Sequence, residues 1–311
     1  MVEGLIDIII VNWNSGELLK DCVNSILTNT FTNYIIHVMD NGSTDDSVGS
    51  LPNNNKIAIH SLNKNLGFGK ACNEGLQYCN GDFILLLNPD TIIRSETLSK
   101  AIHFMKGNRK CIVYGCAQED EYGSLQKFTV GRFPNVVTFC NEVLGLSSIA
   151  PRVFKNGFIC TDWDYAESRY VDHVMGSFYL IRADWVKKYG FMDDRYFVYL
   201  EDIELSKKVI NSGGKIYYDR ENIICHKQGG ISKQVKAKRL FYSLHAKHLY
   251  IKKHFSFLGF LMCDFVMLIP GFFSRLIHAI LIERRMTALK ETVQGHFYLY
   301  KTLFSGIKFL P

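Results

Sequence analysis

Short apolar runs in the first 110 residues alternate with segments of helical periodicity, and this alternation constrains the fold more than any other feature. Asp7–Val11, Tyr34–Met39 and Phe83–Leu87 have the composition of buried strands, and a shorter run covers Ile57–His60. Strands that alternate with helices form βαβ units, in which the strands lie parallel. The sequence therefore predicts an α/β fold: a mixed, mainly parallel sheet with helices on both faces.

Polar clusters follow three of these runs. Asn12-Trp13-Asn14 comes after the first, Asp40-Asn41-Gly42-Ser43 after the second and Asn88-Pro89-Asp90 after Phe83–Leu87. Turn chemistry alone also places Asn, Asp, Gly and Pro at such points. In open α/β sheets, however, ligands bind at the carboxyl ends of the strands. Three clusters in succession favour a binding site at that edge.

The sequence that follows residue 110 is less regular. Residues 111–172 mix strand-like runs with Gly- and Pro-marked loops. After them, Ser177–Arg182 is predicted as a strand and Glu201–Ser212 as a helix that ends at Gly213-Gly214. Lys215–Tyr218 and Ile223–Cys225 are predicted as two short strands.

Charge is unevenly distributed along the chain. The formal net charge is +6, but residues 231–311 contain 13 Lys/Arg and 3 Asp/Glu, whereas residues 1–230 contain 23 and 27. A slightly acidic body thus precedes a strongly basic tail. We expect the boundary between two domains near residue 232.

The tail combines a basic helix, Lys236–His254, with an apolar segment, Phe255–Ile282. The apolar segment is interrupted by Asp264, Pro270, Arg275 and His278. A membrane span needs about 20 nearly uninterrupted apolar residues. We therefore expect the tail to lie in the plane of an anionic membrane surface. A helical subdomain that packs on the core is the alternative. Nucleic acid is not an expected partner, because the basic residues are spread among apolar ones.

The nine cysteines are scattered, odd in number and free of C-x-x-C pairs. This pattern predicts reduced thiols in the cytoplasm, with neither a disulfide framework nor a zinc site. The N-terminal apolar run, Ile8–Val11, is too short for a signal peptide. We expect a cytoplasmic location.

Seven short segments, all but the last within residues 5–231, follow one another in an order that is typical of one protein family. They are IIIVNWNS, VMDNGSTDDSV, NKNLGFGKACNEGL, GDFILLLNPDT, GSFYLIR, FVYLEDIELSKKVINSGG and HKQGGIS, the last being residues 226–232. In this order the chain resembles the family 2 inverting glycosyltransferases, which have the GT-A fold and use nucleotide-sugar donors. Asn88-Pro89-Asp90-Thr91 and Arg132-Phe133-Pro134 are similar to the corresponding runs of bacterial rhamnosyltransferases.

The resemblance implies a nucleotide-sugar site at the strand ends. Asp40 would accept a hydrogen bond from a pyrimidine ring N–H, although the residue could equally form an Asx-turn. Gly67 would let the backbone approach the diphosphate or ribose at a helix start. The full set of implied donor-binding residues is Val11, Asn12, Asn14, Asp40, Asn65, Gly67, Lys70, Asn88 and Gly176.

A divalent metal, Mg²⁺ or Mn²⁺, is the cofactor that the resemblance implies. Such ions are held by one or two carboxylates together with phosphates and water, and Asp90 is suited to this position. His226 would be a further ligand of the metal or the diphosphate; its alternative role is that of a structural histidine. Asn88 could contribute only a neutral oxygen or contact the ribose.

An acceptor hydroxyl must lose a proton during transfer, and a carboxylate can remove it. The resemblance implies Asp202 as this base and Glu201 as the residue that orients the acceptor. Acidic residues are also favoured in the first turn of a helix by its dipole alone. The preceding run Tyr196–Leu200 looks strand-like, and Glu204 is expected to face solvent. No second carboxylate is placed as a nucleophile, which agrees with single displacement and inversion.

The sequence thus predicts a GT-A catalytic domain over 1–232, with a nucleotide-binding half over 1–110 and an acceptor half over 111–232, and a membrane-associating tail over 233–311. The expected reaction moves rhamnose from a dTDP donor to a lipid-linked saccharide during surface polysaccharide assembly, on the inner face of the cell membrane. Transfer of galactose, N-acetylglucosamine or fucose from a UDP or GDP donor is the first alternative. A non-catalytic nucleotide-sugar-binding or scaffold subunit is the second. A homo-oligomer is compatible with either.

Overall fold

The computed structural model describes residues 4–227 and 236–305, which form parts of two compact units. The first unit comprises Met1–Gly131, Tyr165–Asp194 and Glu201–Ile231, and the second comprises Arg132–Asp164, Arg195–Leu200 and Ser232–Pro311. This division differs from a single boundary near residue 232. Residues 132–164 join the C-terminal helices because they pack there: Glu142 accepts a 2.8 Å hydrogen bond from the ammonium group of Lys247.

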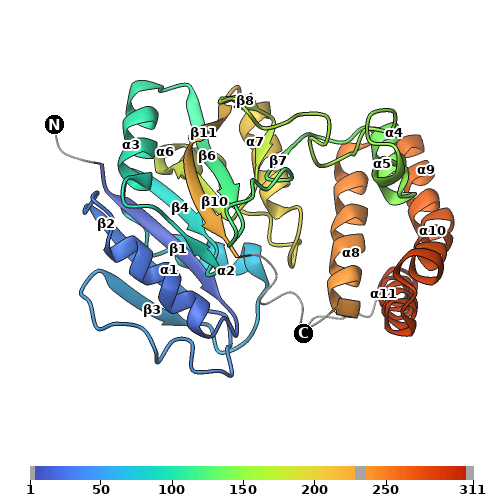
Figure 1. Ribbon diagram of the computed structural model, residues 1–311, viewed down its shortest axis with the longest axis horizontal. Coiled ribbons are helices and arrows are strands. Elements are labelled where there is room, and N and C mark those ends of the chain that lie inside the picture. The colour runs from blue at the N-terminus through green and yellow to red at the C-terminus, as the bar shows by residue number, and fades with distance from the viewer. Residues whose placement is uncertain (1–3, 228–235, 306–311) are drawn as a thin grey trace. The chain divides into compact units, whose positions relative to one another are not determined.

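A nine-stranded mixed sheet forms the centre of the first unit (Figure 1). Its order is β3-β2-β1-β4-β10-β6-β11-β5, and β8 pairs with β11. The strands are β1 (Ile6–Asn12), β2 (Tyr34–Asp40), β3 (Ile57–Ser61), β4 (Phe83–Leu87), β5 (Thr91–Ile92), β6 (Cys111–Glu119), β8 (Arg169–Val171), β10 (Phe178–Arg182) and β11 (Lys215–His226). Neighbours from β3 to β4 are parallel, and β10 runs antiparallel between β4 and β6. The predicted α/β fold is confirmed.

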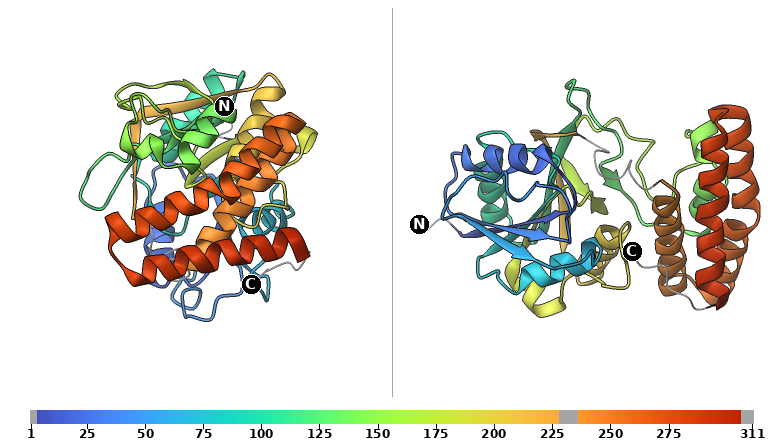
Figure 2. Two further views of the ribbon diagram at one scale, coloured as in Figure 1. Left: turned by 90° about the vertical axis from the view of Figure 1, so that its right-hand side faces the viewer. Right: turned by 90° about the horizontal axis from the view of Figure 1, so that it is seen from below.

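Helices cover both faces of this sheet (Figure 2). Helices α1 (Glu17–Leu27) and α3 (Thr97–Gly107) pack on one face, where Ile6, Ile8 and Ile10 join a buried core with Leu19 and Val23. Helices α2 (Phe68–Leu76), α6 (Ala183–Tyr189) and α7 (Glu201–Asn211) cover the opposite face. Because side chains alternate along a strand, Asp7 and Ile9 point to the α2 side.

Two predictions about local structure were wrong. Lys215–His226 is one strand rather than two, with a register shift between Asp219 and Ile223 that accommodates the irregular middle. Tyr196–Leu200 is not a strand. Its last two residues, Tyr199 and Leu200, have φ of 73° and 63°, a left-handed conformation that is costly for residues with a side chain.

The polar clusters at the strand ends lie along one edge of the sheet. Asn12 pairs with Asp40 across the ends of β1 and β2. The N–H of Asn88, just after β4, donates to the carbonyl of Ser177, just before β10, at 3.2 Å. The end of β11 pairs with β5 through His226 and Thr91. Segments far apart in the chain therefore meet at the carboxyl edge of the parallel strands.

The described part of the second unit is helical. It contains α4 (Val136–Val143), α5 (Leu146–Ile149), α8 (Lys236–His254), α9 (Phe257–Leu268), α10 (Pro270–His278), the π-helical turn η2 (Ala279–Glu283) and α11 (Met286–Ser305). Helix α8 packs against α9 and α11, and α4 packs against α9. The predicted basic helix over Lys236–His254 is confirmed. The short pair β7 (Val130–Gly131) and β9 (His173–Val174) completes the first unit.

Apolar side chains are exposed along α9, α10 and η2. Phe257 and Leu258 are 72% and 76% exposed, and the surface continues through Phe265, Phe273 and Ile277. Within the described residues, Phe257–Glu283 is a helical stretch long and apolar enough to cross a membrane by length and composition. The interruptions that favoured an in-plane arrangement thus lie within this stretch, among exposed apolar residues.

Candidate active site

Asp90 and His226 form a buried pair at the carboxyl edge of the sheet. The Oδ1 atom of Asp90 lies 3.2 Å from Nε2 of His226, and the two residues are 7% and 6% exposed. Backbone pairing holds them together, because the N–H of Lys227 donates to the carbonyl of Asp90 at 3.0 Å. The side chain of Gln126 donates to the carbonyl of His226 at 2.8 Å. The remainder of that sequence motif, from Gln228 to Ser232, lies outside the described residues.

This pair has the donor chemistry of a divalent metal site. Ligand bonds of about 2.1 Å at right angles place two ligand atoms about 3 Å apart, close to the 3.2 Å between Asp90 and His226. The other ring nitrogen of His226, Nδ1, is buried and has no hydrogen-bond partner among the described residues. The carboxylate oxygen suits Mg²⁺ or Mn²⁺ when phosphate and water supply the other positions, and the imidazole of His226 can act as a further ligand or contact the diphosphate. The residues therefore fit the implied cation.

Asp202 is fixed at the first turn of α7. Its Oδ2 atom accepts the N–H of Gly176 at 2.9 Å, and its Oδ1 atom accepts the N–H of Ile203 at 2.9 Å. His173 lies beside it, with Nε2 3.7 Å from Oδ2 of Asp202. The other ring nitrogen of His173 contacts Oγ of Ser206 at 3.0 Å. A carboxylate with both oxygens oriented in this way can accept a proton in a defined direction.

Glu201 differs from its neighbour. The residue is buried, and its Oε2 atom has no hydrogen-bond partner in the part of the chain that the structure describes. Burial, reinforced by the negative charge of Asp202, raises the pKa of Glu201 from 4.5 to about 8. Two adjacent carboxyl groups thus differ in environment, as acid and base groups of active sites often do. The expectation that Glu204 faces solvent was wrong, because this residue is also buried.

Asn12 and Asn14 organise the loop that follows β2. The side-chain nitrogen of Asn12 donates to Ser47 at 2.8 Å, to Ser43 at 3.0 Å and to Asp40 at 3.3 Å. The side-chain oxygen of Asn14 accepts the N–H of Thr44 at 2.7 Å. The Oδ1 atom of Asp40 accepts the N–H of Ser43, three residues on, at 3.3 Å, whereas the Asx-turn considered for Asp40 would use the N–H two residues on. Val11 is buried immediately before this cluster.

A second polar turn precedes α2. The side-chain oxygen of Asn65 accepts the N–H of Gly67 at 2.9 Å, and Asn65 in turn receives a hydrogen bond from Asn41 at 3.1 Å. Gly67 has φ of 84°, which only glycine adopts at little cost. Lys70 is exposed in the first turn of α2. The cluster after β2 is thereby joined to the start of this helix.

The two carboxylate centres share a backbone scaffold. Gly176 holds Asp202, and its neighbour Ser177 accepts the N–H of Asn88, two residues before Asp90. Asn88 is half-buried at this junction. One short stretch of chain before β10 therefore positions both the Asp202 carboxylate and the segment that bears Asp90.

The sequence model of glycosyl transferase family 2 matches residues 7–190, more than half of the chain. The chain belongs to this family. The matched part contains the donor-side clusters from Val11 to Gly176, and Glu201, Asp202 and His226 follow it. The protein is thus a glycosyltransferase.

Curated relatives of this glycosyltransferase are bacterial. "Glycosyltransferase GlyG" of Streptococcus pneumoniae is 23% identical over 234 residues, which cover 73% of this chain and 72% of the relative. "Rhamnosyltransferase WbbL" of Escherichia coli is 31% identical over 161 residues, which cover 49% of this chain and 57% of the relative. The match to the second protein thus has the higher identity over a shorter stretch.

Solved structures share the fold of this glycosyltransferase. A mannosyltransferase from Pyrobaculum calidifontis, in complex with GDP-Man and Mn²⁺, aligns over 99% of this chain and 89% of its own with a TM-score of 0.57 and 10% identity. TarS residues 1–349 from S. aureus align over 98% and 93% with a TM-score of 0.52 and 13% identity. Both likenesses establish the GT-A-like fold.

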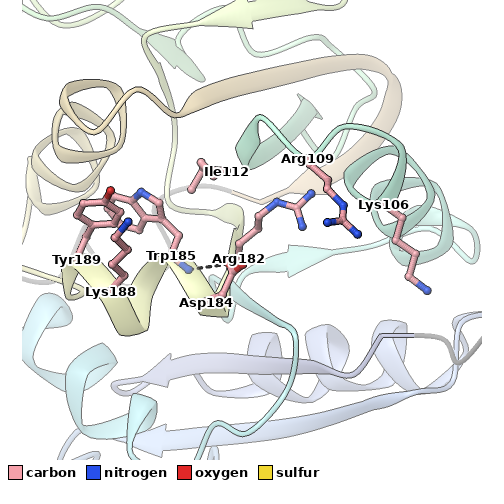
Figure 3. Close-up of a pocket in the computed structure, with 8 residues that line it drawn as sticks. All are labelled: Lys106, Arg109, Ile112, Arg182, Asp184, Trp185, Lys188 and Tyr189. Atoms are coloured by element: carbon pink, nitrogen blue, oxygen red, sulfur yellow. Dashed lines mark hydrogen bonds between the residues drawn. The ribbon is translucent and has the colours of Figure 1, made fainter.

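A basic pocket of about 560 Å³ lies at the other end of β10 (Figure 3). Its lining residues include Lys106, Arg109 and Lys188, with Trp185 at one side. Arg182 also lines it, but its guanidinium group donates to backbone carbonyls, including that of Cys111 at 2.8 Å. This arginine therefore fixes the chain between α3 and β6, and the pocket contains none of the predicted site residues.

Sequence reasoning missed several residues that organise the glycosyltransferase site. Ser43 and Ser47 receive the hydrogen bonds of Asn12, and Asn41 links two loops. Their presence in a Ser- and Asn-rich stretch was visible, but their partners were not. His173 was assigned no role in the site, although it lies next to Asp202. The sequence did not indicate that His173 is buried, because the residue directly follows the charged Asp172.

Proposed function

We propose that this glycosyltransferase transfers a sugar from a nucleoside diphosphate donor with inversion, and that Asp202 is the general base. The observation that carries the proposal is the shared scaffold at Gly176 and Ser177, which anchors Asp202 beside the segment that bears Asp90. A base and an anion-stabilising site must lie on opposite sides of the reacting carbon. Their attachment to adjacent backbone groups supports a common substrate site for the two.

Each residue then has a defined task. Asp202 takes the proton from the acceptor hydroxyl while the hydroxyl oxygen attacks the anomeric carbon of the donor sugar. The bond from that carbon to the diphosphate breaks, and the nucleoside diphosphate leaves with the electron pair. A divalent cation held by Asp90 and His226 would stabilise the negative charge that develops on the diphosphate. Glu201 keeps its proton near neutral pH, because its pKa is raised to about 8, and can donate a hydrogen bond to the acceptor.

The proposed donor is dTDP-rhamnose. Its support is the similarity to a protein named rhamnosyltransferase and the Asn88-Pro89-Asp90-Thr91 run. Asp40 and the backbone of Val11–Asn14 would contact the base, while Asn65, Gly67, Lys70, Asn88 and Gly176 would surround the diphosphate and sugar. The GDP-Man bound to the Pyrobaculum calidifontis structure supports a GDP donor as one alternative; a UDP donor is the other.

The proposed acceptor is a lipid-linked saccharide at the inner face of the cell membrane. The exposed apolar residues of α9 and α10 support this choice, since groups of exposed apolar residues rimmed by polar ones mark membrane-interaction sites. Basic residues flank the patch, with Lys252 and Lys253 before it and Arg284 and Arg285 after it. Anionic head groups attract such residues. The catalytic unit and the helical unit would thus bring the enzyme and its acceptor to the same surface.

A donor screen tests the proposed reaction. Purified protein is incubated with dTDP-rhamnose, UDP-sugars or GDP-sugars and a synthetic lipid-linked saccharide, and released nucleoside diphosphate is measured. We expect acceptor-dependent release with dTDP-rhamnose and an inverted anomeric configuration in the product. A retained configuration would contradict single displacement. Donor binding without transfer to any acceptor would favour the scaffold alternative.

Two variants assign the roles of the carboxylates. Asp202→Asn should lower turnover by at least about 100-fold, because a general base contributes about 10²–10⁴-fold, while donor binding persists. Asp90→Asn should instead raise the Mg²⁺ or Mn²⁺ concentration needed for half-maximal activity. Asp172→Asn, at an exposed position near the site, is the matched control and should retain full activity. Normal turnover in Asp202→Asn would exclude this residue as the base.

A further inference from the structure

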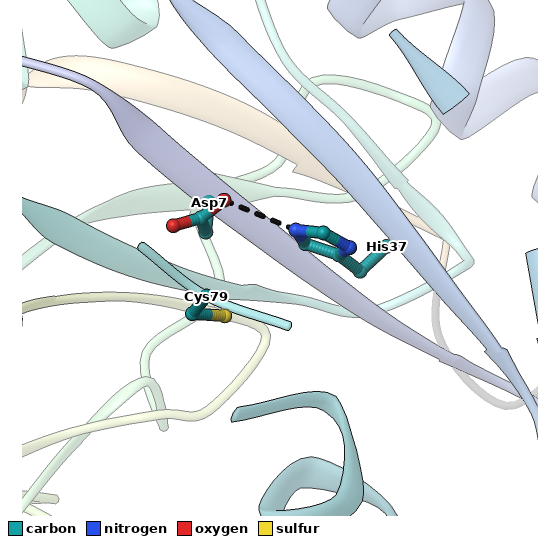
Figure 4. Close-up of side chains that lie close together, drawn as sticks. All are labelled: Asp7, His37 and Cys79. Carbon is teal, nitrogen blue, oxygen red and sulfur yellow. Dashed lines mark hydrogen bonds and ion pairs between the residues drawn. The ribbon is translucent and has the colours of Figure 1, made fainter. Parts of the chain in front are cut away.

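A cluster of metal-binding side chains lies outside the proposed active site (Figure 4). Asp7 of β1, His37 of β2 and Cys79, between α2 and β4, each offer one ligand atom, and these atoms lie within 4.8 Å of one another. Asp7 and His37 are buried, and Cys79 is half-buried. The spacing of the nine cysteines did not indicate this cluster, because the three residues of the cluster come from segments that are distant in the sequence.

Asp7 and His37 are already oriented toward each other. The Oδ1 atom of Asp7 lies 3.0 Å from Nε2 of His37. The other carboxylate oxygen, Oδ2, accepts the N–H groups of Asn80 at 2.8 Å and Gly81 at 2.6 Å. Asp7 is therefore fixed in place by the backbone next to Cys79. One oxygen remains directed at the imidazole.

His60 supports the ring of His37 from its far side. The Nδ1 atom of His37 lies 3.3 Å from Nε2 of His60, and the ring of Tyr78 stacks on His60 with centroids 3.8 Å apart. Histidine ligands of metals commonly use their second ring nitrogen in such a hydrogen bond, which fixes the ring and its tautomer. The arrangement thus contains both a ligand set and a support for one ligand.

We propose that Asp7, His37 and Cys79 bind a divalent transition-metal ion of the zinc class. Carboxylate oxygen, imidazole nitrogen and thiolate sulfur are the ligand types of zinc sites, whereas Mg²⁺ prefers oxygen ligands alone. Three protein ligands leave a fourth tetrahedral position for water. The site is thereby chemically distinct from Asp90 and His226.

The metal would hold strands of the sheet together, with water in the fourth position rather than the fourth protein ligand of a closed structural zinc site. Asp7 lies five residues before Asn12 in β1, which corresponds to about 17 Å along a strand. The ion would therefore sit away from the strand ends where transfer is proposed. The ion would cross-link the start of β1, the middle of β2 and the chain that leads into β4. The inference does not depend on the proposed sugar transfer.

Cobalt spectroscopy on the full-length protein tests the site. Co²⁺ is added to reduced, metal-free protein, and the near-ultraviolet band of thiolate-to-cobalt charge transfer is recorded. We expect the band to saturate at one equivalent, to disappear on addition of Zn²⁺ and to persist in excess Mg²⁺. Stoichiometric Zn²⁺ should also raise the melting temperature, because an ion that binds only the folded state stabilises it.

Variants identify the ligands. Cys79→Ser should remove the cobalt band and weaken Zn²⁺ binding at least 10-fold, and His37→Gln should do the same. Cys140→Ser, which replaces another half-buried cysteine, should keep the band. A wild-type protein with no band and no Zn²⁺-dependent rise in melting temperature would overturn the proposal, as would a band that survives in Cys79→Ser. These readouts do not involve activity, so they are separate from the test of the transferase.

Discussion

At the scale of single residues, the position of the Asp202 carboxylate depends on Gly176. A Cβ atom at Gly176 would lie 3.3 Å from Oδ2 of Asp202, closer than an ordinary van der Waals contact. The N–H of Gly176 also donates to that oxygen at 2.9 Å. A methyl group here would displace the carboxylate without removing any functional group.

Gly176→Ala should therefore lower kcat by about 10-fold or more, because small misplacements of catalytic groups are costly. The free energy of unfolding should change by less than about 1 kcal/mol, since most substitutions without a large clash have small effects. Steady-state kinetics and urea denaturation measure the two quantities. Gly107→Ala, where a Cβ meets nothing within 4 Å, is the control. An unchanged kcat would show that Asp202 does not need this close contact.

Glu201 gives a prediction about pH. Its pKa is about 8 in the folded protein and near 4.5 when unfolded. Between these values the folded state holds a proton that the unfolded state has lost, so stability falls as pH rises, with a slope of up to about 1.4 kcal/mol per unit. This contribution is complete below pH 4.5 and is lost by about pH 8. Glu201→Gln, which cannot ionise, should flatten the profile over this window.

Urea denaturation between pH 5 and pH 8.5 measures this effect. Wild type and Glu201→Gln should differ most at the alkaline end, where the variant is the more stable protein. Glu96→Gln, an exposed residue, should follow the wild-type profile. Parallel profiles for wild type and Glu201→Gln would show that Glu201 is ionised throughout.

At the scale of elements, the ends of β1 and β2 are joined by one buried amide. Asn12→Ala removes the donor to Ser47, Ser43 and Asp40. Unpaired buried polar groups cost about 1–3 kcal/mol, so we expect a stability loss of about 2 kcal/mol and a higher KM for the donor. Asn24→Ala, on the exposed side of α1, should change neither. A normal donor KM in Asn12→Ala would show that this loop does not contact the nucleotide.

The elements that could be predicted were those with a local signal. Phe83–Leu87 is a continuous apolar run, and the structure forms β4 over the same residues. The stretch from 111 to 172 could not be divided, because its elements are short and depend on distant partners. Helix α4 is an instance: Asn135 and Thr138 form a reciprocal cap, but the helix packs on α9, more than 100 residues later.

The site was predictable only in part, and for a related reason. Strand-end clusters such as Asn12 and Asp40 are visible because each follows an apolar run. The proximity of Asp90 and His226 is not visible in their spacing, and only the family resemblance suggested a common role. The left-handed backbone at Tyr199 and Leu200 had no signal, since neither residue favours that conformation. Long-range pairing, rather than propensity, determines these features.

At the scale of the whole molecule, the uneven charge and the exposed apolar helices predict membrane binding. The chain should bind vesicles that contain phosphatidylglycerol more strongly than vesicles of phosphatidylcholine, and added salt should weaken only the first interaction. The double variant Phe265→Glu/Phe273→Glu should reduce binding to both at least 10-fold, because it removes exposed apolar area and adds negative charge.

Vesicle co-sedimentation measures these affinities. Tyr122→Glu, which alters an exposed aromatic residue of the first unit, should bind like wild type. If the double variant sediments with vesicles as well as wild type does, α9 and α10 do not form the membrane contact. Circular dichroism of each variant is the control that shows whether the helices remain folded.

If His226 holds the proposed cation, the pairing of β11 with β5 determines when the enzyme becomes competent during its synthesis. β11 ends at His226, and it brings that histidine to Asp90, which was translated 136 residues earlier. Domains generally fold as units from the N-terminus while the ribosome is still adding residues. A nascent chain that already contains β1, β2 and β4 still lacks one of the two proposed metal ligands. With His226 in the proposed role, catalysis would have to wait until the chain has passed residue 226, when the segment that leads to the helical tail is next to be translated.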